Sequence, residues 1–168
     1  MEVFDAVRTV LAVRSYERKP IPPEVTQRIV EAAHLSASAS NRQPWHFIVV
    51  ENPATLKQLG ALARTGPYIA ESALAVVVAI EQTQFALSDA SRAIQSMILT
   101  AWSEGVASNW VGFFGLDAVK AALGLPADLD VLAIIPFGYP KAAKVIGKKK
   151  RKPLSEVAYR ERFDTRWS

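Results

Sequence analysis

Two uninterrupted apolar runs, at residues 73–80 and 131–137, constrain the fold of this 168-residue chain more than any other feature. A strand with one face in water alternates apolar and polar residues, whereas a strand covered on both faces reads as a continuous apolar run. We therefore predict two strands at the centre of a sheet. Both faces of that sheet need a covering layer, so a three-layer arrangement is expected.

Helical patterns supply the covering layers. Apolar side chains recur at helical spacing in five segments, and turn residues mark some of their ends, such as Asn52-Pro53 at a helix start and Gly105 after the longest segment. The predicted helices are 3–11, 23–36, 53–64, 86–104 and 116–123, and a third strand is predicted at 46–51. The length is typical of one domain, so we predict a single α+β domain over residues 1–168.

The composition excludes several kinds of site. The chain has no cysteine, which excludes disulfides, thiolate metal ligands, iron–sulfur clusters and a cysteine nucleophile. His34 and His46 are the only histidines, so no metal site is predicted. No apolar run reaches the ~18 residues of a membrane span, and no secretory signal opens the sequence. We expect a cytoplasmic protein with no membrane partner.

Positive charge is concentrated near the C-terminus. The net charge is +4, yet residues 141–152 alone contain seven basic side chains and no acidic one. This basic patch is compatible with a solvated surface, a phosphate clamp, or contacts to anionic lipid or nucleic acid. It lacks interleaved aromatic residues, so nucleic acid is not the expected partner.

The side chains alone do not suggest a catalytic group. The sequence contains none of the short motifs of serine hydrolases, zinc proteases or phosphate-binding loops, and Asp128 and Asp130 flank a predicted strand as solvated turn residues would. An enzyme with so few reactive side chains depends on a cofactor for its chemistry. We therefore predict no catalytic residue in the chain itself.

One loop suggests where a flat cofactor would bind. Residues 36–43 are small or polar. Ser38 and Ala39 let main-chain N–H groups approach a flat polar ligand, and the amides of Asn41 and Gln43 add donors and acceptors. The alternative is an ordinary helix end followed by a turn.

A second group of residues suggests a phosphate. Arg14 and Ser15, with Arg8 and Arg18 nearby, place three guanidinium groups and a hydroxyl near a predicted junction of helix and loop. Guanidinium groups bind phosphate in a bidentate manner. Solvated surface arginines are the alternative.

These segments, taken in order, resemble the FMN-dependent nitroreductase family over nearly the whole chain. The matching segments are Val13-Arg14 with Pro20-Ile21-Pro22, Ser38 with Asn41 and Gln43-Pro44-Trp45, Asp89 with Ala93 and Gln95, Gly138-Tyr139-Pro140, and Lys149-Lys150-Arg151-Lys152-Pro153-Leu154. The departures are Val10-Leu11-Ala12 where the family has Arg-Arg-Ser, Ala37 for a proline and Ser96 for an asparagine.

The resemblance implies a homodimeric three-layer α+β fold with a central mixed, mainly antiparallel sheet and FMN at the subunit interface. It implies NADH or NADPH as the electron donor. It also implies a nitroaromatic, a quinone or a similar electron-poor small molecule as the acceptor in a ping-pong mechanism. The apolar tail at about 155–168 is expected to pack on the partner subunit.

Site residues follow from the same resemblance by position. The phosphate or ribityl chain would meet Arg14, with Ser15 beside it, and Lys149 and Arg151 would clamp the phosphate. The flavin ring would be lined by Ser38, Ala39, Asn41 and Gln43, while Val111 and Gly112, with Phe113, would lie near its N5 edge. Trp110, Phe113 and Phe114 are expected as pocket walls, and Arg8 or Arg18 is expected to replace the missing Arg-Arg-Ser group.

Two alternatives to this function stay open. One is a flavoenzyme of the same fold with other redox chemistry, such as dehalogenation or dehydrogenation. The other is a non-enzymatic binding module that uses the basic patch at 141–152.

Overall fold

An antiparallel sheet forms the centre of the molecule. The structure is a computed structural model that describes residues 1–112, 115–141 and 149–167. The described strands are β1 (Trp45–Val50), β2 (Leu74–Glu81), β3 (Ala107–Ser108), β4 (Val111–Gly112) and β5 (Leu129–Gly138). They pair in the order β1-β2-β5-β3, with β4 also paired to β5, and every pairing of these strands is antiparallel.

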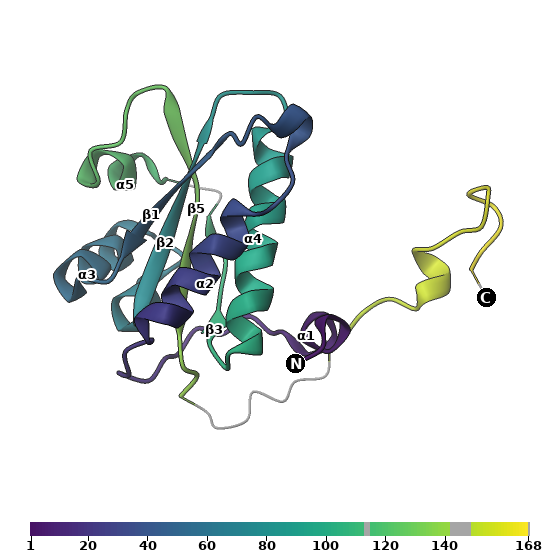
Figure 1. The fold of residues 1–168 in the computed structure, drawn as a ribbon, viewed down its shortest axis with the longest axis horizontal. Coiled ribbons are helices and arrows are strands. Elements are labelled where there is room, and N and C mark those ends of the chain that lie inside the picture. The colour runs from purple at the N-terminus through teal and green to yellow at the C-terminus, as the bar shows by residue number, and fades with distance from the viewer. Residues whose placement is uncertain (113–114, 142–148, 168) are drawn as a thin grey trace.

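Helices cover both faces of this sheet. The described α-helices are α1 (Val3–Thr9), α2 (Pro23–His34), α3 (Pro53–Leu62), α4 (Ala86–Ser103) and α5 (Asp117–Ala122). Figure 1 shows α2 and α4 on one side of the sheet and α3 and α5 on the other, as the two packed cores require. The predicted α+β, three-layer fold is therefore confirmed.

The apolar run of β2 explains the two cores. Side chains alternate between the faces of a strand, and accordingly Val76 and Val78 pack with Ile94 and Met97 of α4, whereas Val77 packs on the opposite face against α3 and α5. All of these side chains are fully buried. Because each face of the strand is covered by a different helical layer, every position in the run has to be apolar.

The first helix is shorter than the sequence pattern predicts. It ends at Thr9 rather than residue 11, and the chain then runs extended beside β3. Ala12 forms a parallel bridge with Ser108, and the Val13 N–H donates to the Ser108 carbonyl at 2.9 Å. Pairing with β3 thus overrides the local helical periodicity and brings Val10 and Leu11 next to the middle of α4.

The C-terminal segment projects away from the body of the molecule (Figure 1). It contains one turn of 3-10 helix at Leu154–Glu156 and a stacked pair of rings, Tyr159 and Phe163, whose centroids lie 4.4 Å apart. Phe163 is 82% exposed and Trp167 is 44% exposed. The expectation that this tail packs on a partner subunit stays a prediction.

No helix in the described parts of the chain is both long and apolar enough to cross a membrane.

Candidate functional site

A cavity of about 530 Å³ lies between α1, the extended segment after it, the middle of α4 and the segment around β3. Its walls are mainly apolar, with polar groups from α4 and the β3 region and two cations from the basic patch. The lining residues are Val7, Val10, Leu11, Ala12, Gln95, Ile98, Ser108, Asn109, Trp110, Lys149 and Arg151. Residues far apart in the sequence therefore meet at one place.

Among the described residues, the charged side chains that line this cavity are Lys149 and Arg151. Burial, and then the charge of Arg151, lowers the pKa of the Lys149 ammonium group, whose Nζ also donates to the Val7 carbonyl. Both effects disfavour the positive charge, and an anionic ligand would oppose them. The cavity is thus suited to an anion held beside an apolar surface.

The two amide side chains of the cavity differ in their surroundings. Asn109 is 5% exposed and its Nδ2 donates to the Tyr68 hydroxyl and, at 3.2 Å, to the Trp110 carbonyl, so this amide is committed to holding the local structure. Gln95 is exposed on α4 and faces the cavity. Ser108 and Asn109 were missed by the sequence reasoning, because only the pairing of residue 12 with β3 brings them here.

The loop at residues 36–43, called here the Ser/Ala loop, adopts an unusual backbone conformation. Ser40, Asn41 and Gln43 have φ values of 50°, 54° and 52°, which lie in the left-handed region that non-glycine residues seldom occupy. The Ser38 hydroxyl accepts from the Gln43 N–H at 3.0 Å, and the Gln43 amide donates to the Asn41 carbonyl at 3.1 Å. The loop is therefore an ordered turn.

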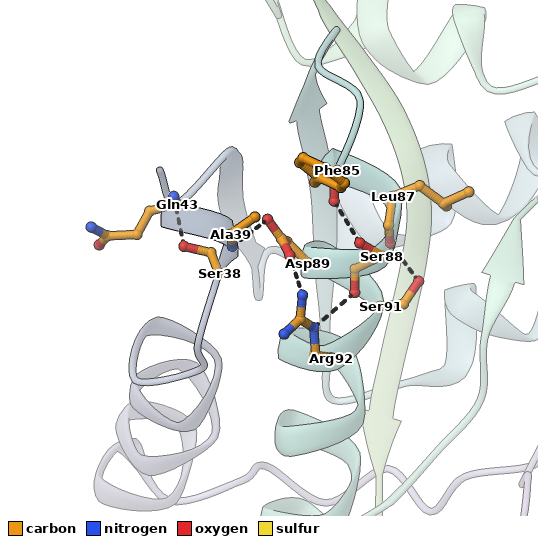
Figure 2. Close-up of polar contacts among 9 residues, drawn as sticks. All are labelled: Ser38, Ala39, Gln43, Phe85, Leu87, Ser88, Asp89, Ser91 and Arg92. Atoms are coloured by element: carbon orange, nitrogen blue, oxygen red, sulfur yellow. Dashed lines mark hydrogen bonds and ion pairs between the residues drawn. The ribbon is translucent and has the colours of Figure 1, made fainter. Parts of the chain in front are cut away.

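A buried carboxylate from α4 contacts this loop. The Ala39 N–H donates to Asp89 Oδ2 at 3.1 Å, and Asp89 also pairs with Arg92 one turn along the helix (Figure 2). The side chain of Asp89 is 1% exposed. A hollow of about 180 Å³ lies beside Asp89, between the loop and the turn at Thr83.

The two predicted parts of the site lie apart in one chain. Ser38, Ala39, Asn41 and Gln43 are near Asp89 at the start of α4, whereas Lys149 and Arg151 face Gln95 farther along the same helix. No residue of the loop lines the cavity among the residues that the structure describes. The cation cavity and the loop are therefore two separate surfaces of a single chain.

Arg14 and Ser15 lie outside the cavity. Both are exposed, and the Ser15 carbonyl accepts from the Lys141 N–H at 3.2 Å. Arg8 forms an exposed ion pair with Asp5 at 3.0 Å and also lies outside the cavity in the described structure. The role expected of each arginine stays a prediction.

Val111 and Gly112 form β4 and pair with β5. The Val111 side chain is buried in the core on the α3 side of the sheet, so any contact with a ligand would come from its backbone. Phe113, Phe114, Lys144 and Lys148, which were expected in a pocket wall or in the basic patch, lie outside the described residues.

Comparison with known proteins shows what this arrangement is similar to. The sequence profile of the Nitroreductase family matches residues 8–87 and 70–139. A relative from Archaeoglobus fulgidus, provisionally named NADH dehydrogenase/NAD(P)H nitroreductase, is 30% identical over 153 residues, which cover 85% of this chain and 88% of the relative.

Two further proteins are similar to this chain over most of its length. An iodotyrosine deiodinase from Nematostella vectensis is 23% identical over 195 residues, covering 93% of this chain and 74% of the relative. The solved structure of an FMN-dependent nitroreductase from Clostridium difficile R20291 superposes with a TM-score of 0.80 at 23% identity, covering 86% of this chain and 91% of that one. This structural likeness supports the fold.

Proposed function

Because this chain belongs to the nitroreductase family and is a flavin-dependent oxidoreductase, we propose that its cofactor is FMN and that NADH or NADPH is the electron donor. The observation that carries the proposal is the cavity in which Lys149 and Arg151 face an apolar wall. Family membership argues against a non-enzymatic module that works through the basic patch alone.

The cavity suits the phosphate end of FMN. A phosphate dianion needs cations or N–H donors around it, and Lys149 and Arg151 supply two cations in a wall that has no acidic side chain among the described residues. In this proposal Lys149 and Arg151 bind the phosphate, and the neighbouring apolar residues Val10 and Leu11 exclude water from it. Arg14 and Ser15 are proposed to contribute only if they move toward the cavity on binding.

The Ser/Ala loop suits the ring of the flavin. The pyrimidine edge of that ring presents donors and acceptors, and Ser38, Asn41 and Gln43 carry matching groups on an ordered backbone. The loop and the cavity are separate in one chain, yet a single FMN has to contact both. We therefore propose a homodimer in which the loop of one subunit completes the cavity of the other.

Exposed apolar groups support this dimer. Val3 and Phe4 of α1 are 76% and 74% exposed, and the tail exposes Phe163 and Trp167. Large apolar groups left in water at two ends of a chain indicate a surface that another subunit covers. We propose that the tail at 155–168 packs on the partner, that residues 1–168 form one domain with this tail, and that the enzyme acts in the cytoplasm.

Bound FMN would supply the redox chemistry, accepting a hydride from NADH or NADPH and passing two electrons to a nitroaromatic, quinone or similar acceptor in a ping-pong sequence. The protein's contribution is to bind and orient. The backbone N–H groups near Val111 and Gly112 are proposed to donate to the ring edge, and Trp110 is proposed as a wall for the acceptor.

The first experiment is the visible absorption spectrum of the purified protein, with mass analysis of the molecule released by heat. Flavin bands and the mass of FMN, at about one per subunit, are the expected result. Initial rates at several concentrations of NADH and of a quinone should then give parallel double-reciprocal lines. A protein that stays colourless after incubation with FMN would contradict the proposal, and intersecting lines would contradict the ping-pong sequence alone.

One relative favours a second candidate function. The deiodinase likeness covers 93% of this chain, so reductive dehalogenation is the alternative chemistry for the same site. Reduced enzyme mixed with an iodinated phenol distinguishes the two, because release of iodide, with no reoxidation by a quinone, would favour dehalogenation.

A further inference from the structure

The loop at 38–43 has a conformation that its own residues do not favour. Apart from asparagine, residues with a Cβ resist the left-handed region, yet Ser40 and Gln43 adopt it on either side of Asn41, which adopts it too. A conformation of this kind persists only where the surrounding structure holds it. A contact with a residue outside the loop is therefore needed to hold its left-handed backbone.

The flanks of the loop are attached to the body by contacts of their own. The Ser36 and Ser96 hydroxyls lie 2.8 Å apart, and the Glu81 N–H donates to the Pro44 carbonyl at 3.2 Å. Between these flanks, the hydrogen bond from Ala39 to Asp89 joins residues 38–43 to another element within the described parts of the chain. The other hydrogen bonds of these residues in the described chain stay inside the loop, apart from the one that the Trp45 N–H at the start of β1 donates to the Gln43 carbonyl at 2.8 Å.

The surroundings of the Asp89 carboxylate favour its hydrogen bond with the Ala39 N–H. Its carboxylate lies in the first turn of α4, where the helix dipole favours a negative charge, and it is shielded from water. One oxygen accepts from the Ala39 N–H and the other from the Arg92 guanidinium, whose outer face is exposed (Figure 2). A backbone N–H that donates to a buried carboxylate forms a charge-assisted hydrogen bond, which is stronger than a neutral one.

We infer that Asp89 is a positioning residue: its buried carboxylate, paired with Arg92, holds Ala39 and so fixes the left-handed backbone of Ser40, Asn41 and Gln43 in the form that receives the flavin ring. The inference rests on the proposed function, because it is that function which makes the loop a ring-binding surface. Asp89 itself touches neither flavin nor substrate in this scheme.

The chemistry of the contact predicts how the substitutions rank. Asp89→Ala removes the acceptor of the Ala39 N–H altogether. Asp89→Asn keeps an oxygen for Ala39 but turns an NH2 group toward the donors of Arg92, so the tether is weakened without a change of volume. Asp117→Ala is the matched control, because Asp117 is an exposed first-turn carboxylate of α5 away from the loop.

The first measurement uses the flavin-free protein. Hydrogen exchange in peptides that span 38–43 should be at least about tenfold faster in Asp89→Ala than in the wild type, with Asp89→Asn between them. Peptides from the β2–β5 core and the Asp117→Ala control should be unchanged. Unchanged exchange at 38–43 in the Asp89 variants would overturn the inference, whatever the flavin result.

The second measurement is the affinity for FMN, read by quenching of flavin fluorescence. Asp89→Ala should raise the dissociation constant at least about tenfold. In the Asp89→Ala variant, the added substitution Ser40→Gly should lower the dissociation constant about threefold or more, because glycine accepts the left-handed conformation without strain. The same substitution in the wild type should change the dissociation constant less. A loss that Ser40→Gly does not relieve would mean a merely structural role and would overturn the inference.

The two proposals fail in different ways. If the wild type binds no flavin but Asp89→Ala loosens the loop, the proposed function fails and the tether stands. If the wild type binds FMN and Asp89→Ala binds it equally well, the tether is not needed and the proposed function stands. If Asp89→Ala does not fold, Asp89→Asn with and without Ser40→Gly gives the same comparison.

Discussion

Replacing the two cations of the cavity tests the phosphate end of the proposed site most directly. Lys149 and Arg151 are the charged lining residues, and the segment Val10-Leu11-Ala12 adds only apolar surface. Arg8, which we expected as a substitute cation, is paired with Asp5. The phosphate would therefore depend mainly on two contacts.

The expected magnitude follows from those two contacts. A hydrogen bond to a charged group contributes about 1.5–3 kcal/mol, and the lower value applies to both side chains, because Arg151 is exposed to solvent and Lys149 is only partly buried. Lys149→Ala and Arg151→Ala should each raise the dissociation constant for FMN about tenfold, and the double variant should raise it about 100-fold. Riboflavin, which lacks the phosphate, should bind all of these variants with the wild-type affinity.

The assay is a titration of flavin-free protein with FMN and with riboflavin, followed by fluorescence at low and at high salt. Salt should weaken the binding of FMN and leave riboflavin unchanged, because screening acts on the charged contact. Lys150→Ala is the matched control, since Lys150 lies between the two residues in sequence but is exposed and outside the cavity.

Two results would refute this reasoning. If the double variant weakened FMN and riboflavin equally, Lys149 and Arg151 would support the cavity without contacting a phosphate. If Lys150→Ala weakened FMN as much as Lys149→Ala, the effect would come from the net charge of the patch and not from this cavity.

Four further outcomes are expected. Burial lowers the pKa of Lys149, and phosphate binds the charged amine, so the affinity for FMN should fall as pH rises through that pKa. Lys149→Arg should remove this pH dependence in fluorescence titrations at alkaline pH. Gly138→Ala should destabilise the fold by about 1–3 kcal/mol in urea unfolding, because the new Cβ would lie 2.9 Å from the buried Tyr16 ring. Asn52→Ala should lower stability by about 1 kcal/mol, since its side chain caps two N–H groups of α3. Deleting 155–168 should convert the proposed dimer to a monomer in light scattering, and an intact dimer would contradict the role given to the tail.

The sequence specified the secondary structure closely because most elements carry a complete local signal. Pro53 marks the start of α3, and an uninterrupted apolar run marks β2. The observed ends of both elements lie within two residues of the predicted ends. The exceptions are the short strands β3 and β4, which were not predicted. Their conformation depends on pairing with distant residues, and a local pattern does not contain that information.

The candidate site divides in the same way. Sequence reasoning found the basic residues Lys149 and Arg151 and the loop from Ser38 to Gln43, since their residue types suggest their chemistry. It did not find Ser108 and Asn109 as cavity residues, nor that Asp89 holds Ala39. Serine and asparagine are common, and a single aspartate in a helix gives no sign of the loop that folds against it.

By itself the sequence therefore determined which segments are helices and strands, that the sheet is covered on both faces, and which chemical groups are available to a flavin. Those properties follow from side-chain periodicity and from residue type, which are local. Only the tertiary structure decided that residues 10–12 lie along β3, that two cations face an apolar wall, and that the Ser/Ala loop lies away from them. These facts depend on contacts between residues as many as 142 positions apart, because chain folding and not residue type sets which surfaces meet.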